Sequence, residues 1–210
     1  MTERRRLLAL ALAWPTAALA QVVVPTPRQT LGPFYPDKPL EQDADLVTVA
    51  GGKGVAQGEI THLSGRIVDS NGKPVRDARV EIWQCNAHGR YHHPRDSSGL
   101  PLDPNFQGFG ASVTDAAGSY AFRTIKPVPY PGRTPHIHYR VVGRGFEPFV
   151  TQMYIAGFPQ NDSDGVFMGV RDPKARSALL ANFRSINAPG GRTEHTAQFD
   201  IVLGFTPRQG

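Results

Sequence analysis

The sequence predicts a mainly β protein: an antiparallel β-sandwich with long functional loops and one short helix in the C-terminal region. The first observation is composition, because 22 Gly and 19 Pro among 210 residues favour many turns and therefore short strands. The second is that runs of strand character recur at even spacing from about residue 60. The third is that 40% of the residues are hydrophobic and 20% are charged, which suits one compact domain with a core.

Strand patterns account for most of the chain after residue 60. Residues 63–86, LSGRIVDSNGKPVRDARVEIWQCN, predict a strand, a Ser-Asn-Gly turn and a second strand. Residues 111–125, ASVTDAAGSYAFRTI, repeat that layout and place Tyr120 and Phe122 on one face of the second strand. Three further runs of strand character follow, PHIHYRVVG, PFVTQMYIAG and TAQFDIVLGF.

One helix is expected in the stretch RDPKARSALLANFRSI, residues 171–186. Asp172 can cap its first turn, and Pro173 fits the first helical position. A partial apolar stripe is formed by Leu179, Leu180 and Phe183.

The N-terminal part of the sequence predicts a leader peptide followed by an irregular arm. Residues 1–20, MTERRRLLALALAWPTAALA, have the basic start, apolar run and small-residue end of a secretory signal peptide. We therefore expect export, to the periplasm or out of the cell, and no membrane span in the mature chain. The arginine run fits both the general secretory route and the twin-arginine route. Residues 21–60 are rich in Pro, Gly and Asp and predict an irregular arm, and residues 61–210 predict the sandwich domain.

Charge and cysteine content exclude some classes of function. The formal net charge is +5, but the basic residues are scattered and form no stripe, so no nucleic-acid partner is expected. Cys85 is the only cysteine, so the chain has no internal disulfide. We interpret Cys85 as a small buried hydrophobic residue, with metal binding as the alternative.

A His-x-His pair is the first sign of a metal site. Side chains alternate along a strand, so His136 and His138 project from one face while Ile137 and Tyr139 project from the other. Two imidazoles placed in this way can bind one metal ion. Two polar residues on a solvated face would give the same pattern, so the pair alone does not decide.

Two tyrosines add to this pattern. Tyr130 is held between Pro129 and Pro131, which restrict the backbone on both sides of it. Tyr91 stands near the start of a long stretch, residues 86–110, and a stretch of that length is usually functional. Two phenols and two imidazoles suit Fe(III), whereas zinc more often recruits Cys, His or carboxylates. Packed aromatic residues without a ligand role are the alternative interpretation.

Several motifs occur in an order that is typical of one family. They are VEIWQCNAHGRYHH, DPNFQGFG, TDAAGSYAFRTIKPVPYPG, PHIHYRV and TQMYIAG. Together they resemble the intradiol aromatic ring-cleavage dioxygenases, in particular small single-domain relatives of protocatechuate 3,4-dioxygenase. The similarity runs from about Gln29 to Tyr154 and more faintly towards the C-terminus.

This resemblance implies an oxidoreductase with one non-haem Fe(III) per chain. The implied ligands are Tyr91, Tyr130, His136 and His138, with Tyr130 and His138 in the axial positions. A small aromatic diol would chelate the iron, and Tyr130 would leave and take a proton. Incorporation of both atoms of O2 would then cleave the ring between its two hydroxylated carbons and give a cis,cis-muconic acid.

The resemblance also implies roles around the iron. Arg133 would stabilise negative charge developing on the ring, and Gln152 would donate to the same region. Gly32, Pro33 and Tyr35 of the arm would contact the substrate. The alternatives are a surface ion pair for Arg133, an outward polar position for Gln152, and simple packing of the arm across the sandwich.

The chain departs from the best-known members in three ways. Only five residues separate Tyr130 from His136, where those members have a longer insertion. The chain lacks the long helical N-terminal segment of the catechol enzymes, so their helical dimer is not expected, although a homo-oligomer remains an option. Export is the third departure, because well-known members are cytoplasmic, and it suggests catechols met outside the cytoplasm.

Two other classes of protein compete with this interpretation. Residues 65–83 and 113–125 also resemble transthyretin-like or carboxypeptidase-regulatory-like modules, which bind carbohydrate or protein. Such a module would have no need for Tyr91, Tyr130 and the His pair together. A zinc hydrolase using the two histidines is the second competitor, but no carboxylate base adjoins the HIH stretch.

Overall fold

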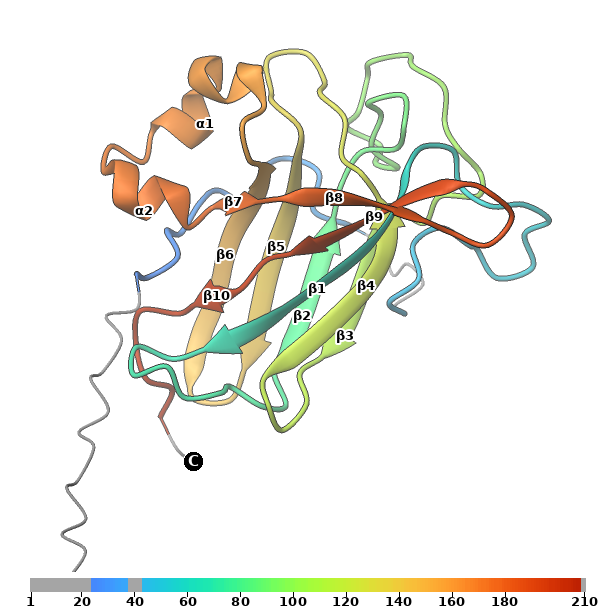
Figure 1. Ribbon diagram of the computed structural model, residues 1–210. Helices are drawn as coiled ribbons and strands as arrows, with labels where there is room; N and C mark the ends of the chain where they lie inside the picture. The colour runs from blue at the N-terminus through green and yellow to red at the C-terminus, as the bar shows by residue number, and fades with distance from the viewer. Residues whose placement is uncertain (1–23, 38–42, 209–210) are drawn as a thin grey trace, which may run out of the picture.

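Two sheets of five strands each form the body of the protein in the computed structural model, which describes residues 24–37 and 43–208 (Figure 1). In the first sheet the strand order is β10-β1-β9-β8, and β4, which lies off this path, pairs antiparallel with β1. Its strands are β1 (Ile60–Val68), β4 (Ser119–Ile125), β8 (Phe183–Asn187), β9 (Thr193–Gln198) and β10 (Ile201–Val202).

The second sheet has the order β3-β2-β5-β6-β7. Its strands are β2 (Arg79–Trp83), β3 (Phe109–Val113), β5 (His136–Gly143), β6 (Phe146–Ile155) and β7 (Leu180–Ala181). The predicted mainly β sandwich is therefore confirmed. Most neighbouring strands are antiparallel, and the parallel pairs are β1 with β9, β1 with β10, and β6 with β7.

Alternation of side chains builds the core between the sheets. Along β1, Leu63 and Ile67 are buried in the main apolar cluster, whereas Ser64 and Arg66 are exposed. Tyr120 and Phe122 on β4 both enter this cluster, as their shared face predicts. The second sheet contributes its inner face, from Val80, Ile82, Ile137, Tyr139, Val141, Phe149 and Met153.

Strands that follow one another in the sequence often lie in opposite sheets. β1 pairs with β4, β9 and β10, whereas β2 pairs with β3 and β5. The Ser-Asn-Gly turn between β1 and β2 therefore connects the two layers instead of closing a hairpin. β3 and β4 are divided in the same way. Local turn chemistry predicts that the chain reverses, but burial of both apolar faces decides the sheet that each strand joins.

The expected helix at 171–186 is correct at its start and wrong in its length. Asp172 caps α2 (Pro173–Ser177) by accepting from the backbone N–H of Lys174. The chain then becomes extended, because Leu180 pairs with Tyr154 as β7, and residues 183–187 form β8. Two short helical segments precede α2: the 3-10 turn η1 (Pro159–Ser163) and α1 (Gly165–Met168).

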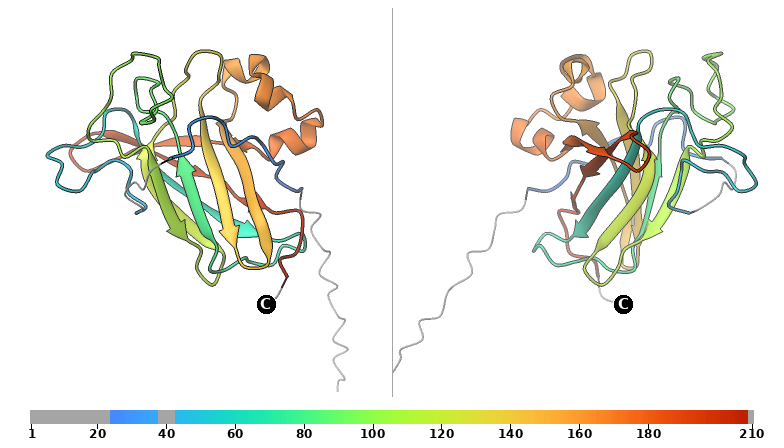
Figure 2. Two further views of the ribbon diagram at one scale, coloured as in Figure 1. Left: turned by 180° about the vertical axis from the view of Figure 1, so that it is seen from behind. Right: turned by 45° about the vertical axis from the view of Figure 1, so that its right-hand side comes forward.

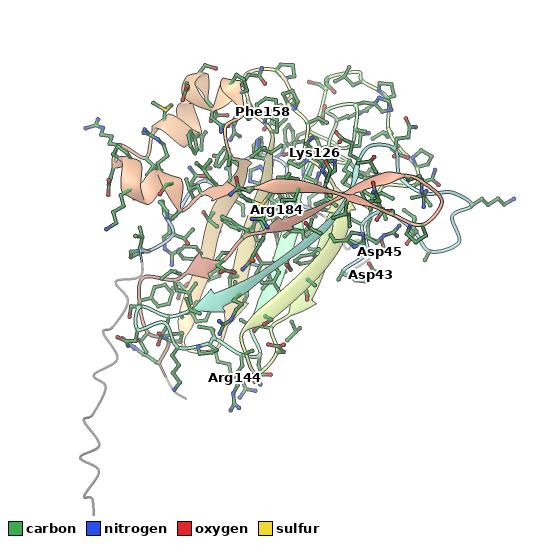
Figure 3. The ribbon with its side chains drawn as sticks, in the orientation of Figure 1. Asp43, Asp45, Lys126, Arg144, Phe158 and Arg184 are labelled. Carbon is green, nitrogen blue, oxygen red and sulfur yellow. The ribbon has the colours of Figure 1, made fainter. Side chains whose placement is uncertain are left out.

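Long connections gather at one end of the sandwich. The loops that follow β2 and β4 lie there together with the start of β5 (Figure 1). Lys126 and Phe158 lie towards this end, and Arg144 in the β5–β6 turn lies at the opposite end (Figure 3).

Asp45, in the segment before β1, pairs with Arg123 of β4 through a 3.0 Å contact between Oδ2 and Nη1.

The arm crosses the outer face of the second sheet, as seen from behind in Figure 2. The backbone N–H of Gln29 donates to the carbonyl oxygen of Val150 on β6 over 2.9 Å. Further contacts, from Gln152 Nε2 to the carbonyl of Thr30 and from Gly32 to His138, place the arm over β6 and over β5, which carries the His-x-His pair.

Two predictions about the N-terminal region stay predictions. The expected signal peptide, residues 1–20, lies outside the described residues. The boundaries at 20 and 60 are likewise untested. Among the helices that the structure describes, none is long and apolar enough to cross a membrane.

Candidate metal centre

The His-x-His pair lies at the start of β5. Ile137 and Tyr139 point into the core, so His136 and His138 face the outer side of the sheet. Both histidines are nevertheless only 1% exposed, because the arm and the loops cover this part of the outer face. Their ring centroids are 4.8 Å apart. The two histidines therefore do not lie on a solvated face, which was the alternative explanation of the His-x-His pair.

Both tyrosines come to the same place from separate loops. The Tyr130 ring lies 5.4 Å from the His136 ring and 5.6 Å from the Tyr91 ring, measured between centroids. Tyr91 in turn lies 6.3 Å from His138. The four residues that the sequence singles out therefore form one cluster, although they span 48 positions of the chain.

The cluster contains polar atoms with no partner among the described residues. Tyr91 Oη, His136 Nε2 and His138 Nδ1 are buried and make no hydrogen bond there. His136 Nδ1 lies 2.7 Å from the carbonyl oxygen of Thr134. A carbonyl only accepts, so Nδ1 carries the proton and Nε2 keeps a free lone pair. Unpaired buried polar atoms are costly, so their convergence here points to a ligand that binds them.

Burial also sets the charge state of these groups. It lowers the pKa of His136 to about 4 and that of His138 well below the ordinary value, so both imidazoles are neutral at pH 7. Burial raises the pKa of Tyr91 well above its ordinary value. It raises the pKa of Tyr130 as well, and the Arg133 cation partly opposes that shift. Neutral imidazoles and oxygen donors that lose a proton on binding fit a hard cation such as Fe(III).

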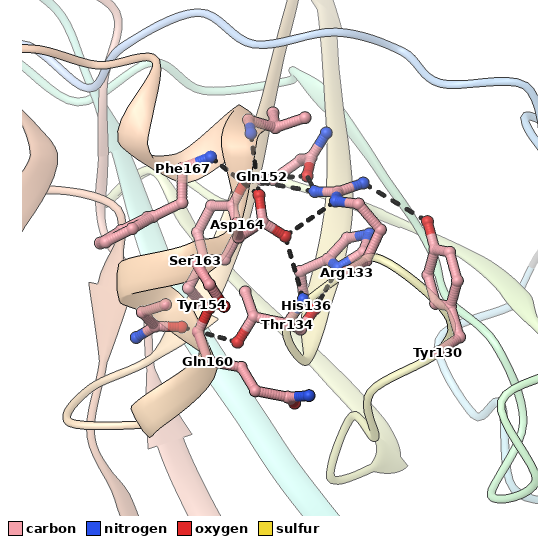
Figure 4. Close-up of polar contacts among 12 residues, drawn as sticks. Tyr130, Arg133, Thr134, His136, Gln152, Tyr154, Gln160, Ser163, Asp164 and Phe167 are labelled. Carbon is pink, nitrogen blue, oxygen red and sulfur yellow. Dashed lines mark hydrogen bonds and ion pairs between the residues drawn. The ribbon is translucent and has the colours of Figure 1, made fainter.

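Arg133 connects this cluster to a buried polar network (Figure 4). Its Nη1 donates to Tyr130 Oη over 3.3 Å, and its Nη2 donates to Gln152 Oε1 over 2.6 Å. Its Nε donates to Asp164 Oδ2 over 2.8 Å. The arginine is therefore in an ion pair, but one directed inward: the Asp164 side chain is fully buried. Gln152 is also fully buried, which differs from an outward polar position.

The three arm residues expected at the substrate are placed differently from one another. Gly32 packs against His138: a Cβ on it would lie 3.1 Å from Cε1, and its φ of +72° favours glycine. Pro33 is exposed. Tyr35 points away from the cluster, because its hydroxyl donates to Glu81 Oε2 over 2.9 Å. Phe34, which sequence reasoning missed, stacks on Tyr91 at 4.5 Å between ring centroids.

Trp83 is a second residue that sequence reasoning missed. Its ring lies parallel to that of His138, with centroids 4.7 Å apart and planes 7° apart. The two residues are direct partners in the β2–β5 register, so a paired-strand alignment could have found the contact. Cys85 packs in the same apolar cluster, and burial raises the pKa of its thiol to about 12. The prediction of a buried hydrophobic cysteine is confirmed.

Two hollows differ in their relation to the cluster. One of about 320 Å³ lies between the arm and the long loop and is lined by Tyr91, His93 and Leu102, among others. A larger one of about 900 Å³ lies at the opposite end of the sandwich, beside Arg144 and Phe146. The larger hollow contains none of the clustered donors. The smaller one adjoins Tyr91, one of the four clustered residues.

A zinc-type site finds no support in the residues described. Within residues 24–37 and 43–208, no group of three or more His, Cys, Asp or Glu side chains is placed to hold a metal ion. The donor set of the cluster is two phenols and two imidazoles, which is unlike the usual zinc sites.

Comparison with known proteins gives the family. A family model described as "Dioxygenase" matches residues 30–204. The protocatechuate 3,4-dioxygenase beta chain of Burkholderia cepacia is 42% identical over 185 residues, which cover 84% of this chain and 78% of that protein. The chain belongs to the intradiol dioxygenases. This is a family of ring-cleaving oxidoreductases, and the predicted family is confirmed.

Other intradiol dioxygenases match with lower identity. A hydroxyquinol 1,2-dioxygenase of Corynebacterium glutamicum is 31% identical over 85% of this chain, which spans 63% of that protein. The dioxygenase domain of a dioxygenase carbohydrate-binding protein fusion from Streptomyces sp. SirexAA-E has a TM-score of 0.66 and 31% identity. That match covers 87% of this chain and 99% of the other. The chain thus spans nearly all of that single domain but under two thirds of the hydroxyquinol relative.

An ion cluster anchors the arm beside the metal centre. Glu81 on β2 accepts from Arg79, from Arg140 and from Tyr35 of the arm, each over 2.9 Å. Burial alone would raise the pKa of Glu81, but these three hydrogen bonds outweigh it and the pKa is lowered. The ring of Tyr35 also stands edge-on to Trp83, so the cluster holds the arm against the ring that stacks on His138.

The lowered pKa of Glu81 predicts how the stability of the protein depends on pH. The ionised form is favoured in the folded chain, so its stabilisation is fully present above the ordinary value of 4.5 and is lost as the pH falls from there through the lower pKa of the folded chain. We expect Glu81→Gln to lower the free energy of unfolding by about 1–2 kcal/mol at pH 7 and by much less at pH 3. Urea denaturation at both pH values measures this. Glu147→Gln, an exposed change on β6, is the control, and an equal loss at both pH values would contradict the assignment.

Proposed function

We propose that this intradiol dioxygenase is a non-haem Fe(III) enzyme that cleaves catechol-type rings between the two hydroxylated carbons. O2 is the second substrate, and the product is a cis,cis-muconic acid. The observation that carries the proposal is the convergence of Tyr91, Tyr130, His136 and His138. Three of these residues, Tyr91, His136 and His138, have a buried polar atom without a partner among the described residues. Family membership supports the same reaction class.

The donor set suits one iron per chain. His136 would bind through Nε2, because its Nδ1 is committed to the carbonyl of Thr134. Tyr91 would bind as a phenolate through its unpaired Oη. When bound, Fe(III) withdraws electron density from a chelated catecholate and so makes the ring reactive towards O2.

Tyr130 is the ligand best placed to take a proton from the substrate. It lies on a loop, is partly exposed, and its hydroxyl accepts a hydrogen bond from Arg133 Nη1 over 3.3 Å. Tyr91 by contrast is held between Phe34 and the loop interior. A phenolate that leaves its position can accept the proton of an incoming diol. Arg133 and Gln152 would then lie beside the aromatic ring of the bound diol. The fixed Arg133 cation would stabilise the negative charge that develops on that ring.

The substrate we propose is a small aromatic diol. Relatives are named for protocatechuate, catechol and hydroxyquinol, which share the two adjacent hydroxyl groups needed for chelation. Phe34 and Gly32 of the arm cover Tyr91 and His138 from the same chain, so one chain supplies both the metal donors and their cover. A homo-oligomer of such chains is compatible with this arrangement.

The first prediction from this function concerns iron and colour. The purified mature chain loaded with Fe(III) should show a broad visible band that shifts on anaerobic addition of catechol. His136→Ala should lose most of its iron and the band, because one of four donors is removed. His92→Ala, an exposed histidine next to Tyr91, is the control and should keep both. A protein that stays colourless after iron loading, or His136→Ala with full iron, would refute the site.

The second prediction concerns Tyr130. Tyr130→Phe should keep iron through the remaining donors but lower kcat for catechol by about 100-fold, because the proton acceptor is lost. Oxygen uptake and mass spectrometry of the product measure this, with a product mass equal to catechol plus two oxygen atoms for the wild type. Undiminished turnover by Tyr130→Phe would contradict the role given to this residue.

We further propose that the enzyme works outside the cytoplasm, on the basis of residues 1–20. Expression of the full sequence in a bacterial host should give a mature chain that begins at Gln21 in the periplasm or the medium. Fractionation and N-terminal sequencing test this. A chain retained in the cytoplasm with its leader intact would refute it.

A further inference from the structure

Asp164 is a fully buried carboxylate at the junction of η1 and α1. Its two oxygens have separate partners (Figure 4). Oδ1 accepts from the backbone N–H groups of Val166 and Phe167, each over 2.9 Å, and so caps α1. Oδ2 accepts from Arg133 Nε over 2.8 Å and from the backbone N–H of Thr134 over 2.9 Å.

The second pair of contacts fixes the direction of the Arg133 guanidinium. This group is planar, so an acceptor that holds Nε also sets where Nη1 and Nη2 point. They point to Tyr130 Oη, at 3.3 Å, and to Gln152 Oε1, at 2.6 Å. Thr134, two residues before His136, is held by the same oxygen. One carboxylate oxygen therefore holds both the arginine and the backbone that leads into β5.

The segment that carries Asp164 is itself anchored to this loop. Thr134 Oγ1 donates to Asn161 Oδ1 over 2.8 Å, and Asn161 Nδ2 donates to the carbonyl of Ile155 over 2.8 Å. The backbone of residues 159–168 is thus tied to the end of β6 and to the loop before β5. Such a support can hold a catalytic group within the narrow tolerance that catalysis requires.

We propose that Asp164 is a positioning residue for ring cleavage: it holds Arg133 so that the guanidinium faces the substrate position beside Tyr130 and Gln152. This rests on the proposed function, because it assigns Asp164 a role in that same reaction. The competing explanation is that Asp164 only caps α1. The two explanations can be separated because capping uses Oδ1 and the hold on Arg133 uses Oδ2.

Asp164→Ser makes that separation in one variant. Serine is a good helix cap, so it preserves an acceptor for Val166 and Phe167. Its shorter side chain carries no charge and releases both Arg133 and the backbone N–H of Thr134. The matched control is Asp172→Ser, which makes the same change at the cap of α2. Iron content and thermal midpoint are measured for every variant before its activity.

Steady-state kinetics with catechol give the main test. We expect Asp164→Ser to lower kcat by about tenfold or more and to change KM by less than about threefold, because Arg133 acts on charge that develops during the reaction. Asp172→Ser should match the wild type. In an Arg133→Met background, Asp164→Ser should add no more than about a twofold loss, since its effect passes through Arg133.

Three outcomes would overturn the proposal. The first is wild-type kcat in Asp164→Ser. The second is a full additional loss in the Arg133→Met background, which would show that Asp164 acts independently of Arg133, for example through Thr134. The third is equal losses in the two cap variants. If Asp164→Ser loses its fold, the nearly isosteric Asp164→Asn replaces it, with the same expected split between kcat and KM.

Failure of the proposed function would look different. A wild-type chain that holds iron but turns over none of catechol, protocatechuate and hydroxyquinol would refute the proposed reaction itself. In that case exchange of the Arg133 Nε–H, followed by NMR in the iron-free chain, still shows whether Asp164→Ser releases the guanidinium. An active wild type together with an Asp164→Ser variant of unchanged activity would refute only the role proposed for Asp164.

Discussion

The alternation of side chains along β5 is the constraint on which the candidate metal centre depends. The strand that places Ile137 and Tyr139 in the core must place His136 and His138 on the outer face of the same sheet. In a simple sandwich that face would meet water. Here the arm crosses it, and Gly32 and Phe34 cover His138 and Tyr91. His136, His138 and Tyr91 are therefore buried without any interruption of the core on the other side of the strand.

Burial of these donors has an energetic consequence. Polar atoms removed from water without a partner destabilise a fold, and Tyr91 Oη, His136 Nε2 and His138 Nδ1 are in that state together. Other parts of the structure support them: Trp83 stacks on His138, the carbonyl of Thr134 orients His136, and Glu81 anchors the arm through Tyr35. A metal ion that binds these unpaired atoms would replace their destabilising burial by a stabilising contact.

The polar network around Arg133 shows why function is spread over distant parts of the chain. Arg133 contacts Tyr130 from the same loop, Gln152 from β6, and Asp164 from the junction before α1. The junction of η1 and α1 lies beside the candidate metal centre, because Asp164 there pairs with Arg133. The short helices α1 and α2 are held by caps and by Tyr154, Phe167 and Leu179. No single stretch of sequence carries this network, and Asp164 has no motif of its own.

The sequence by itself determined the strand faces, the cap at Asp172, the buried state of Cys85 and the four candidate donors, because each follows from local periodicity, turn chemistry or motif order. Only the tertiary structure decided that β1 and β2 lie in opposite sheets, that the helix at 173 ends at Ser177, and that Tyr35 binds Glu81. Those outcomes depend on which apolar faces and charges meet across the fold. Contacts between residues such as Arg133 and Asp164, or Trp83 and His138, arise from strand register and loop docking, which local pattern does not specify.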